Sequence, residues 1–297
     1  MATQMQLPLS PADHWEVQLL LHGYCTVPDL VPPAQVAALD ADLAPQFEET
    51  DFCRGDFYGE YTKRFGRLLT RSEHAAAFVQ HPLIIELVER ALGAWCDTVQ
   101  LNLTQAIEIH PGAPQQMPHR DQDMWEGVKG ETEYLLNVMW PFTPYTQENG
   151  ATLVYPGSHG ARALDPSEPD MSVAVEMVPG SALIFLGSTL HGAGGNSSEA
   201  IRRGMIVSYA LGWLKPYENQ WLAYPPDVAR RFPPELAALV GYRQHRPNLG
   251  NWEGLCPSVL LGEGLPDRIG AVDALRPDQA EMVGAFRRGL GRANGGR

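Results

Sequence analysis

TVQLNLTQAIEIHPG, residues 98–112, begins a run of short apolar segments that decides the fold. The later segments are TEYLLNVMWPF (132–142), GATLVYPGSHG (150–160), VAVEMVPG (173–180), SALIFLG (181–187) and RGMIVSYALGW (203–213). They are rich in β-branched and aromatic residues, and turn pairs such as Pro111-Gly112 and Asn149-Gly150 separate them. Because no helical pattern interrupts the run, it predicts an antiparallel sandwich or barrel over about residues 98–213.

The residues before this core read as mostly helical. Ser10-Pro11 predicts a helix start, Gly23 its end, and residues 24–27 a short strand. Further helices are expected from Pro33 and from His81-Pro82. Residues 48–72 show no clean period and carry several aromatics, which predicts a long loop or lid.

The residues after the core return to short helical patterns, and the Gly/Arg-rich tail at 284–297 is expected to fray. The whole chain, 1–297, is therefore predicted to be a single domain. Its parts are a helical N-terminal layer at 10–95, a β-core at about 98–213 and a C-terminal cap at 214–285.

Composition excludes several classes of protein. Lys and Arg total 22 against 35 Asp and Glu, a formal net charge of −13, which argues against nucleic acid and anionic membrane as partners. No apolar run is long enough for a transmembrane helix, and the first 17 residues lack the basic and apolar regions of a secretory signal. A cytoplasmic location is therefore predicted. The four cysteines fit neither a zinc ribbon nor a disulfide scaffold, so we expect reduced, mostly buried thiols.

Two histidines lie next to a carboxylate in an H-x-[DE] arrangement. His14 and Glu16 fall in a predicted helix, where residues two apart do not face each other, so we interpret them as structural. His119 and Asp121 follow a turn-rich stretch at the start of an extended segment. There, residues two apart point to the same side and can share one metal ion.

A third ligand is needed on a later strand. His191 follows the fully apolar strand SALIFLG and is flanked by glycines, which makes it the best candidate. His159, in a turn, and His110, before Pro111-Gly112, are weaker candidates.

Two histidines and one carboxylate leave three positions of a metal open, which is typical of non-haem Fe(II) oxygenases. In these enzymes 2-oxoglutarate takes two positions and dioxygen the third. The far carboxylate of 2-oxoglutarate then needs a cation, for which a guanidinium is best suited. Arg202 lies at the start of the next strand and Arg203 adjoins it. Strand alternation points only one of them inward, and the pattern does not decide which.

These motifs, with Asn149-Gly150, Pro156-Gly157-Ser158-His159 and Asn196, resemble the phytanoyl-CoA dioxygenase (PhyH) family over roughly residues 15–250. The resemblance implies a mainly β fold with flanking helices and a double-stranded β-helix core, also called jelly-roll or cupin-like. It also implies an enzyme that uses Fe(II), 2-oxoglutarate and O2. A narrower likeness to natural-product members rests on residues 117–122, 211–214 and 239–242.

The same resemblance implies roles for individual residues. The metal ligands are His119, Asp121 and His191, and the presence of Asp121 speaks against halogenation. The residues implied to contact 2-oxoglutarate are Gln116, Thr152 and Arg202, together with Arg64 or Arg67 from the N-terminal loop. Relatives of this kind are often homodimers, so a homodimer is expected here.

The predicted function is oxidation of a small apolar natural product, a terpenoid, polyketide or alkaloid, by hydroxylation or by desaturation or cyclisation. The alternatives are an acyl hydroxylase of the phytanoyl-CoA type, a cupin-like metal isomerase or hydrolase that does not use 2-oxoglutarate, and a non-catalytic binding module. The substrate walls are expected in residues 50–72 and 215–255. The aromatic residues of the first wall are Phe52, Phe57, Tyr58, Tyr61 and Phe65, and Trp125, Met139 and Phe142 are further candidates for lining an apolar pocket.

Overall fold

The computed structural model describes residues 10–165, 167, 171–264 and 270–294. Four sequence predictions fall partly outside the described residues, and one of them is the β-core at about 98–213, which includes residues 166 and 168–170. Residues 1–9 belong to the segment expected to carry no secretory signal, 265–269 belong to the predicted cap, and 295–297 belong to the predicted frayed tail.

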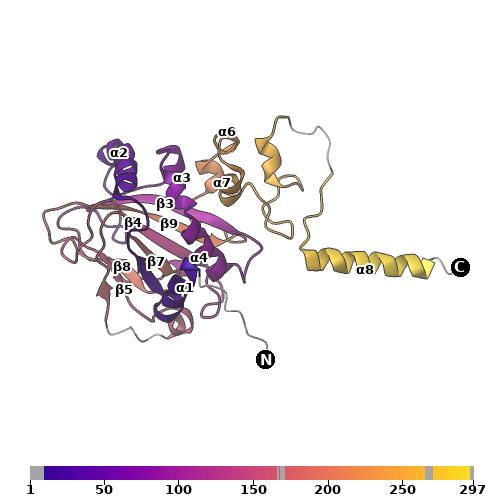
Figure 1. Cartoon of the computed structure of the whole chain (residues 1–297), viewed down its shortest axis with the longest axis horizontal. Helices are drawn as coiled ribbons and strands as arrows, with labels where there is room; N and C mark the ends of the chain where they lie inside the picture. Colours follow the sequence, from indigo (N-terminus) through magenta and orange to yellow (C-terminus); the bar gives the residue numbers. More distant parts are fainter. Residues whose placement is uncertain (1–9, 166, 168–170, 265–269, 295–297) are drawn as a thin grey trace, which may run out of the picture.

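Two antiparallel sheets form the centre of the molecule (Figure 1). The larger sheet has the order β1 (Tyr24–Val27), β7 (Ala182–Leu186), β4 (Leu135–Pro141), β9 (Arg202–Leu211), β3 (Val99–Ile109) and β2 (Thr62–Phe65). The smaller has the order β6 (Val173–Ala174), β5 (Thr152–Val154) and β8 (His191–Ala193). The predicted mainly β architecture with flanking helices is therefore confirmed.

The central strands are buried on both faces, which explains their unbroken apolar sequences. Every residue of β4 and of β7 is buried. On one face a core cluster joins the two sheets and includes Leu103, Met139, Val154, Phe185 and Ile206. On the other face a larger cluster joins the big sheet to the helices α1 (Pro11–His22), α2 (Pro33–Glu49), α3 (Ala75–Val79) and α4 (Pro82–Leu92). A strand covered on both sides shows no apolar–polar alternation.

The N-terminal helix begins and ends where the sequence indicates. Ser10 and Asp13 form a capping box, and Gly23 ends α1 in the left-handed region at φ 81°. Glu16 pairs with Arg90 of α4 at 2.6 Å, which fits the structural role expected for it. These contacts fix α1 against α4.

The segment at 48–72 is more regular than the predicted long loop. Helix α2 continues to Glu49, β2 adds an edge strand to β3, and a 3-10 helix spans Leu68–Thr70. Phe65 packs its ring on Phe47 at 4.7 Å and belongs to the core. A strand of four residues is too short to show a period in the sequence. The irregular part that faces the pocket is therefore reduced to about residues 51–61.

The C-terminal part forms short helices followed by one long one. They are α5 (Gln220–Ala223), α6 (Pro226–Ala229), α7 (Pro234–Leu239), a 3-10 helix at Pro257–Leu261, and α8 (Pro277–Asn294). The tail expected to fray is thus helical up to Asn294, although its glycines lower helix propensity. Helix α8 extends away from the rest of the molecule (Figure 1). None of the described helices combines the length and the apolar character that crossing a membrane requires.

Candidate metal centre and active site

His119, Asp121 and His191 form one cluster, although the last two are 70 positions apart in the chain. One nitrogen or oxygen atom of each lies within 4.8 Å of the others. His119 Nε2 is 3.4 Å from Asp121 Oδ1, and His191 Nε2 is 3.6 Å from Asp121 Oδ2. This is the only group of three or more such ligands found among the described residues.

Backbone pairing places the two histidines side by side. The amide of His119 donates to the carbonyl of His191 at 2.9 Å, and the amide of His191 donates to the carbonyl of His119 at 3.0 Å. Their ring centroids are 4.5 Å apart. Because His191 also begins β8, the small sheet fixes the position of the whole cluster.

Each imidazole is oriented by a backbone carbonyl. His119 Nδ1 lies 3.0 Å from the Met117 carbonyl, and His191 Nδ1 lies 3.0 Å from the Thr189 carbonyl. A carbonyl can only accept, so Nδ1 carries the proton and Nε2 keeps a free lone pair. Both Nε2 atoms face Asp121, as metal ligands must.

Asp121 is held ionised. Burial would raise its pKa, but the positive charge that the neighbouring His191 and His119 carry when protonated, together with a hydrogen bond from Asn137, outweighs that effect and lowers the pKa to about 2. Asn137 Nδ2 donates to Asp121 Oδ2 at 2.8 Å from the central strand β4. Sequence reasoning missed Asn137, and its only signal was one amide in the apolar run LLNVMWP.

The weaker histidine candidates lie outside the cluster. His110 Nε2 contacts Glu108 Oε2 at 3.2 Å, and the ring of His110 packs on Phe52. His159 Nε2 faces the carbonyl of Leu20 at 3.1 Å.

The two arginines that the sequence left undecided point in opposite directions. Arg202 is 2% exposed and lines the pocket beside the cluster, where its guanidinium lies 4.2 Å from the ring centroid of Tyr145. Its Nη1 donates to the Gly150 carbonyl, while its Nε is shielded from solvent and has no partner. Arg203 instead pairs with Glu108 and, at 3.1 Å, with Asp40. Residue alternation along β9 thus directs Arg202 inward.

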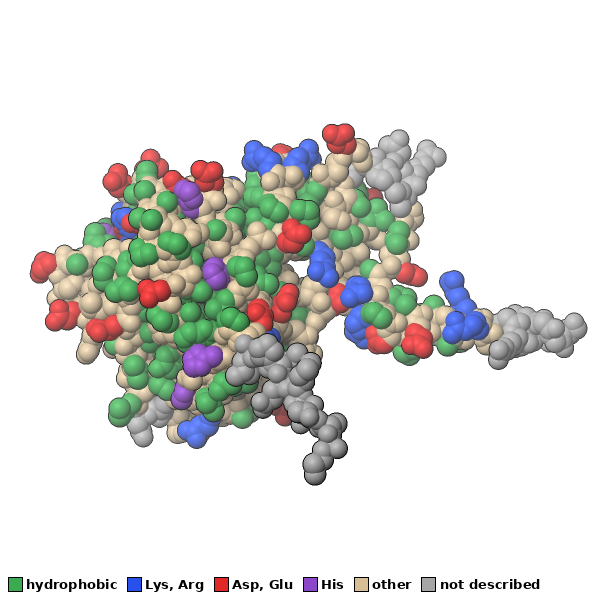
Figure 2. All heavy atoms as spheres, in the orientation of Figure 1, with side chains coloured by type: hydrophobic (Ala, Val, Ile, Leu, Met, Phe, Trp, Pro, Cys, Tyr) green, Lys and Arg blue, Asp and Glu red, His purple; other side chains and the backbone are tan. Residues whose placement is uncertain are grey.

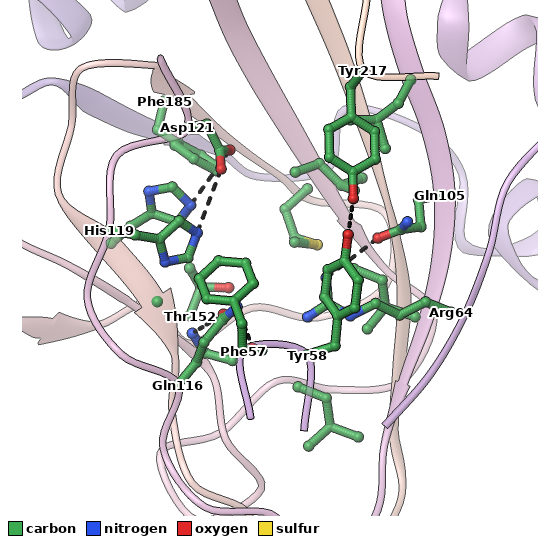
Figure 3. Close-up of a pocket in the computed structure, with 18 of the residues that line it drawn as sticks. Phe57, Tyr58, Arg64, Gln105, Gln116, His119, Asp121, Thr152, Phe185 and Tyr217 are labelled. Carbon is green, nitrogen blue, oxygen red and sulfur yellow. Dashed lines mark hydrogen bonds and ion pairs between the residues drawn. The ribbon is translucent and has the colours of Figure 1, made fainter. Parts of the chain in front are cut away.

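The pocket next to the cluster has a cavity of about 100 Å³ (Figure 3). Its polar lining includes Gln116, Thr152, Arg64, Gln105, Asn102 and Arg202. Gln116 donates to the Phe57 carbonyl at 3.2 Å and accepts from the amide of Ala193. Its apolar lining includes Leu103, Met124, Leu135, Met139, Phe185 and Ile206.

The predicted substrate walls are narrower than expected. From residues 50–72 the pocket takes Phe57, Tyr58 and Arg64, whereas Arg67 is exposed and lies outside it. From residues 215–255 it takes Tyr217 alone. Most of the other aromatic candidates lie elsewhere. Phe142 and Phe65 are core residues, Trp125 packs near Tyr134, and Phe52 and Tyr61 are about half exposed.

The cluster suits a divalent transition metal such as iron. Two neutral imidazole nitrogens and one carboxylate on one side of the site are the donor set that non-haem Fe(II) oxygenases use. The unpartnered Nε of the buried Arg202 fits the second requirement, an anion beside the metal.

A family model described as phytanoyl-CoA dioxygenase (PhyH) matches residues 19–204. The chain belongs to this family. The dioxygenase swnH1 of Metarhizium robertsii is 30% identical over 275 residues, which cover 85% of this chain and 88% of the relative. The dioxygenase trt7 of Aspergillus terreus is 33% identical over 188 residues, which cover 61% of this chain and 65% of the relative.

Solved structures share the fold. The epimerase SnoN of nogalamycin biosynthesis superposes with a TM-score of 0.57 at 19% identity and covers 69% of this chain and 86% of its own. The carbocyclase SnoK of the same biosynthesis gives a TM-score of 0.53 at 20% identity, with 69% and 85% covered. The predicted jelly-roll core is confirmed. Membership of the family and the fit of the cluster also confirm the predicted enzyme class, a non-haem dioxygenase that uses iron and 2-oxoglutarate.

Replacing Asn137 by alanine should weaken iron binding about tenfold to a hundredfold, because outer partners of metal ligands typically have effects of that size. Without this hydrogen bond, Asp121 loses both its orientation and part of what keeps its pKa low. Anaerobic titration with Fe(II) measures the affinity. Asn251→Ala, on the exposed C-terminal segment, is the control, and equal affinities of both variants would contradict the role given to Asn137.

Proposed function

We propose that this enzyme uses Fe(II) held by His119, Asp121 and His191, together with 2-oxoglutarate, to oxidise a C–H bond of a small apolar natural product. The observation that carries the proposal is the cluster itself, in which two oriented Nε2 atoms and an ionised carboxylate face one point at the wall of an apolar pocket. When iron and 2-oxoglutarate are bound, they would allow dioxygen to oxidise the substrate.

Arg202 and Thr152 are proposed to bind the far carboxylate of 2-oxoglutarate. Both are buried, at 2% and 3% exposure, and both line the pocket beside the cluster. Thr152 lies on β5 opposite Ala193 of β8. Ala193 is two residues beyond the ligand His191. Gln116, three residues before His119, is proposed to contact the same molecule. Its amide also ties the loop at Phe57 to β8.

The chain's own part in the reaction is to orient the reactants and exclude water. Phe57 packs on the ring of His119 at 4.9 Å, and Phe185 packs on the ring of His191 at 4.5 Å. These rings limit the movement of the ligands and cover part of the cluster. Reactive species formed in a dry pocket are protected from side reactions.

The substrate class rests on the lining and on the relatives. Most of the side chains beyond the cluster are apolar, which suits a hydrocarbon scaffold. Among the similar structures, SnoN and SnoK are named as enzymes of nogalamycin biosynthesis. A natural product of terpenoid, polyketide or alkaloid type is the proposed substrate, and hydroxylation the proposed outcome. Formation of succinate from 2-oxoglutarate separates this function from a cupin-like isomerase or hydrolase.

The loop at residues 51–61 is proposed to act as a lid. The hydroxyl of Tyr58 contacts that of Tyr217 across the pocket, which joins the loop to the segment after β9 (Figure 3). A cavity of about 100 Å³ is well below the several hundred Å³ of ordinary ligand pockets. This contact must therefore open before 2-oxoglutarate and a substrate can both enter.

A homodimer is also proposed, with α8 at its interface. Met282, Phe286 and Leu290 recur at helical spacing on α8 and are 69%, 67% and 49% exposed. An apolar stripe of this kind on a projecting helix marks an interaction surface. Figure 2 shows both basic and acidic side chains on α8 and on the rest of the visible face. The cytoplasmic location stays a prediction from the sequence.

The proposed function is tested by two neighbouring arginine variants. Arg202→Lys should raise the KM for 2-oxoglutarate about tenfold or more, because Lys keeps the charge but loses the paired hydrogen bonds of a guanidinium. Arg203→Lys is the matched control and should leave this KM near its normal value, since Arg203 is engaged with Glu108 and Asp40. Succinate formation at varied 2-oxoglutarate measures both, and the reverse result would move the role to Arg203.

The metal assignment is tested with histidine variants. His191→Ala should abolish Fe(II)-dependent succinate formation, because an imidazole and a carboxylate alone hold the ion poorly. His110→Ala, outside the cluster, should retain it. Near-native succinate formation by His191→Ala at low micromolar Fe(II) would show that the cluster is not the metal site.

The dimer is tested on α8. Phe286→Ser should shift the protein from dimer to monomer in light scattering coupled to size exclusion, because it removes the middle of the apolar stripe. Arg288→Ser, on the opposite side of the helix, should remain dimeric. A wild-type protein that runs as a monomer at micromolar concentration would contradict the proposal.

A further inference from the structure

Glu218 joins two segments of the pocket wall that lie far apart in the chain. Its neighbour Tyr217 lines the pocket on the side opposite the metal cluster, as does Arg64 of β2 (Figure 3). Glu218 Oε1 accepts a hydrogen bond of 2.9 Å from the amide of Arg67, which lies just beyond the end of β2. One carboxylate therefore links the end of β2 to the segment that follows β9.

The segment that carries Glu218 is itself tied to the central sheet. The amide of Tyr217 donates to Asn102 Oδ1 at 2.7 Å, and the amide of Glu218 donates to the Asn102 carbonyl at 3.0 Å. Gln220 Nε2 donates to the same carbonyl at 3.1 Å. Asn102 is fully buried on β3. The carboxylate of Glu218 thus reaches the turn at Arg67 from a fixed base.

The turn that receives the carboxylate has an unusual backbone. Arg67 lies in the left-handed region, at φ 60° and ψ 40°, which residues with a side chain rarely adopt. Arg71 Nε donates to the carbonyl of Gly66 at 2.9 Å and holds the turn from one side. Glu218 holds it from the other side by satisfying the amide of Arg67. Strained backbone persists only where its surroundings hold it in place.

Gly66 leaves the space that the carboxylate occupies. A Cβ added at Gly66 would overlap Glu218 Oε1, whereas the carbonyl oxygen of Thr104 would lie at an ordinary 3.4 Å from it. The φ of Gly66 is not positive, so its backbone would accept another residue. Glu218 is therefore the obstacle to a side chain at this position.

Keeping a carboxylate at this place is costly. Among the described residues Glu218 Oε2 has no hydrogen-bond partner, and it is shielded from solvent. Burial raises the pKa of Glu218, although hydrogen bonds from the amides of Arg67 and Thr104 act in the opposite direction. A buried polar atom without a partner lowers stability. A residue kept at such a cost beside a pocket points to a role in function.

We infer that Glu218 is a positioning residue that holds the end of β2 against the segment after β9, and so fixes Arg64 and Tyr217 relative to each other. This inference rests on the proposed function, in which the pocket takes 2-oxoglutarate beside the substrate. Tyr217 is then the fixed side of its contact with Tyr58, and the loop at 51–61 is the side that moves.

An anion in this pocket is sensitive to the position of Arg64. Burial first, and then the charge of Arg202, lower the pKa of Arg64, and both arginines line the pocket. 2-Oxoglutarate carries two negative charges, so the positions of both guanidiniums affect its affinity. The metal cluster is held separately, by β8 and by Asn137 of β4. Loss of Glu218 should therefore affect the anion more than the metal.

The test is anaerobic calorimetric titration of the full chain with Fe(II) and then with 2-oxoglutarate. Glu218→Ala should bind 2-oxoglutarate about tenfold more weakly, because a displaced Arg64 gives up a charge-assisted contact, and should bind Fe(II) as the wild type does. Glu218→Gln should bind 2-oxoglutarate nearly normally, because its amide oxygen still accepts from Arg67. Glu73→Ala, an exposed carboxylate in the stretch after this turn, is the matched control.

A double substitution tests whether the turn acts through Glu218. Gly66→Ala should weaken 2-oxoglutarate binding as Glu218→Ala does, because the new Cβ takes the place of the carboxylate. Gly66→Ala combined with Glu218→Ala should bind no more weakly than Glu218→Ala alone, since the obstacle is then gone. Gly270→Ala, where an added Cβ meets no described atom within 4 Å, is the control for replacing a glycine.

Hydrogen exchange gives a readout that needs no ligand. In Glu218→Ala the amides of residues 66–71 should exchange faster, because the amide of Arg67 loses its acceptor. The amides of β8 should keep their protection. Faster exchange over the whole chain, with parallel losses of Fe(II) and 2-oxoglutarate affinity, would make Glu218 an ordinary structural residue and overturn the inference.

Two titration results would also overturn it. One is Glu218→Ala that binds 2-oxoglutarate as tightly as the wild type. The other is a double variant that binds much more weakly than either single variant, which would separate Gly66 from Glu218. If the wild type binds no 2-oxoglutarate, the proposed function fails and hydrogen exchange decides alone. Unchanged protection of residues 66–71 in Glu218→Ala would then contradict the positioning role, and faster exchange confined to them would support it.

Discussion

The active site depends on one piece of backbone pairing, the two hydrogen bonds between His119 and His191. These bonds bring together two segments that lie far apart in the chain and set the two imidazoles next to each other. Asp121 then reaches the same point because Arg120 is extended and Asp121 begins the 3-10 helix Asp121–Met124 directly after it. The geometry of the cluster therefore comes from the sheet and not from the side chains. Its precision is that of the fold, which is the advantage of placing a site on rigid strands.

The same construction explains why the pocket tolerates uncompensated charge. Arg202 and Arg64 enter from β9 and β2, whose backbones are fixed by pairing with β3 on both sides. An arginine on a flexible segment would turn its guanidinium toward water. On a paired strand the side chain of an arginine that faces the pocket stays in the pocket. The free energy for keeping these groups unpaired comes from the apolar clusters on the two faces of the large sheet. Unpaired positive charges held inside a stable fold favour the binding of an anionic ligand.

The main strands, the fold class and the three members of the cluster could be predicted from the sequence, because each depends on a local pattern. Continuous apolar runs marked the buried strands, and H-x-D followed by a strand-end histidine marked the cluster. The choice between Arg202 and Arg203 depends on the register of β9 against β3, which pairs Arg203 with Glu108 and Arg202 with Ile109. The role of Asn137 was missed because it, too, depends on which chain segment lies next to its strand. An amide on a buried strand becomes meaningful only when the neighbouring chain brings Asp121 to it. The predicted loop at 48–72 was too long because it included β2, which forms only by pairing with the edge of β3.

The closed pocket links these features to catalysis. Phe57 packs on His119 while Tyr58, its neighbour, contacts Tyr217 and stacks on Arg64. One short loop thus contacts the metal ligand His119, Tyr217 of the segment after β9, and Arg64. Movement of this loop cannot admit a substrate without also disturbing Phe57, which covers the cluster. A substrate that fits beneath the loop would let it close again, and one that does not would leave it displaced and the cluster open to water. The fit of the substrate beneath the loop would then decide whether oxidation takes place in a dry site, which places selectivity in the lid and chemistry in the sheet.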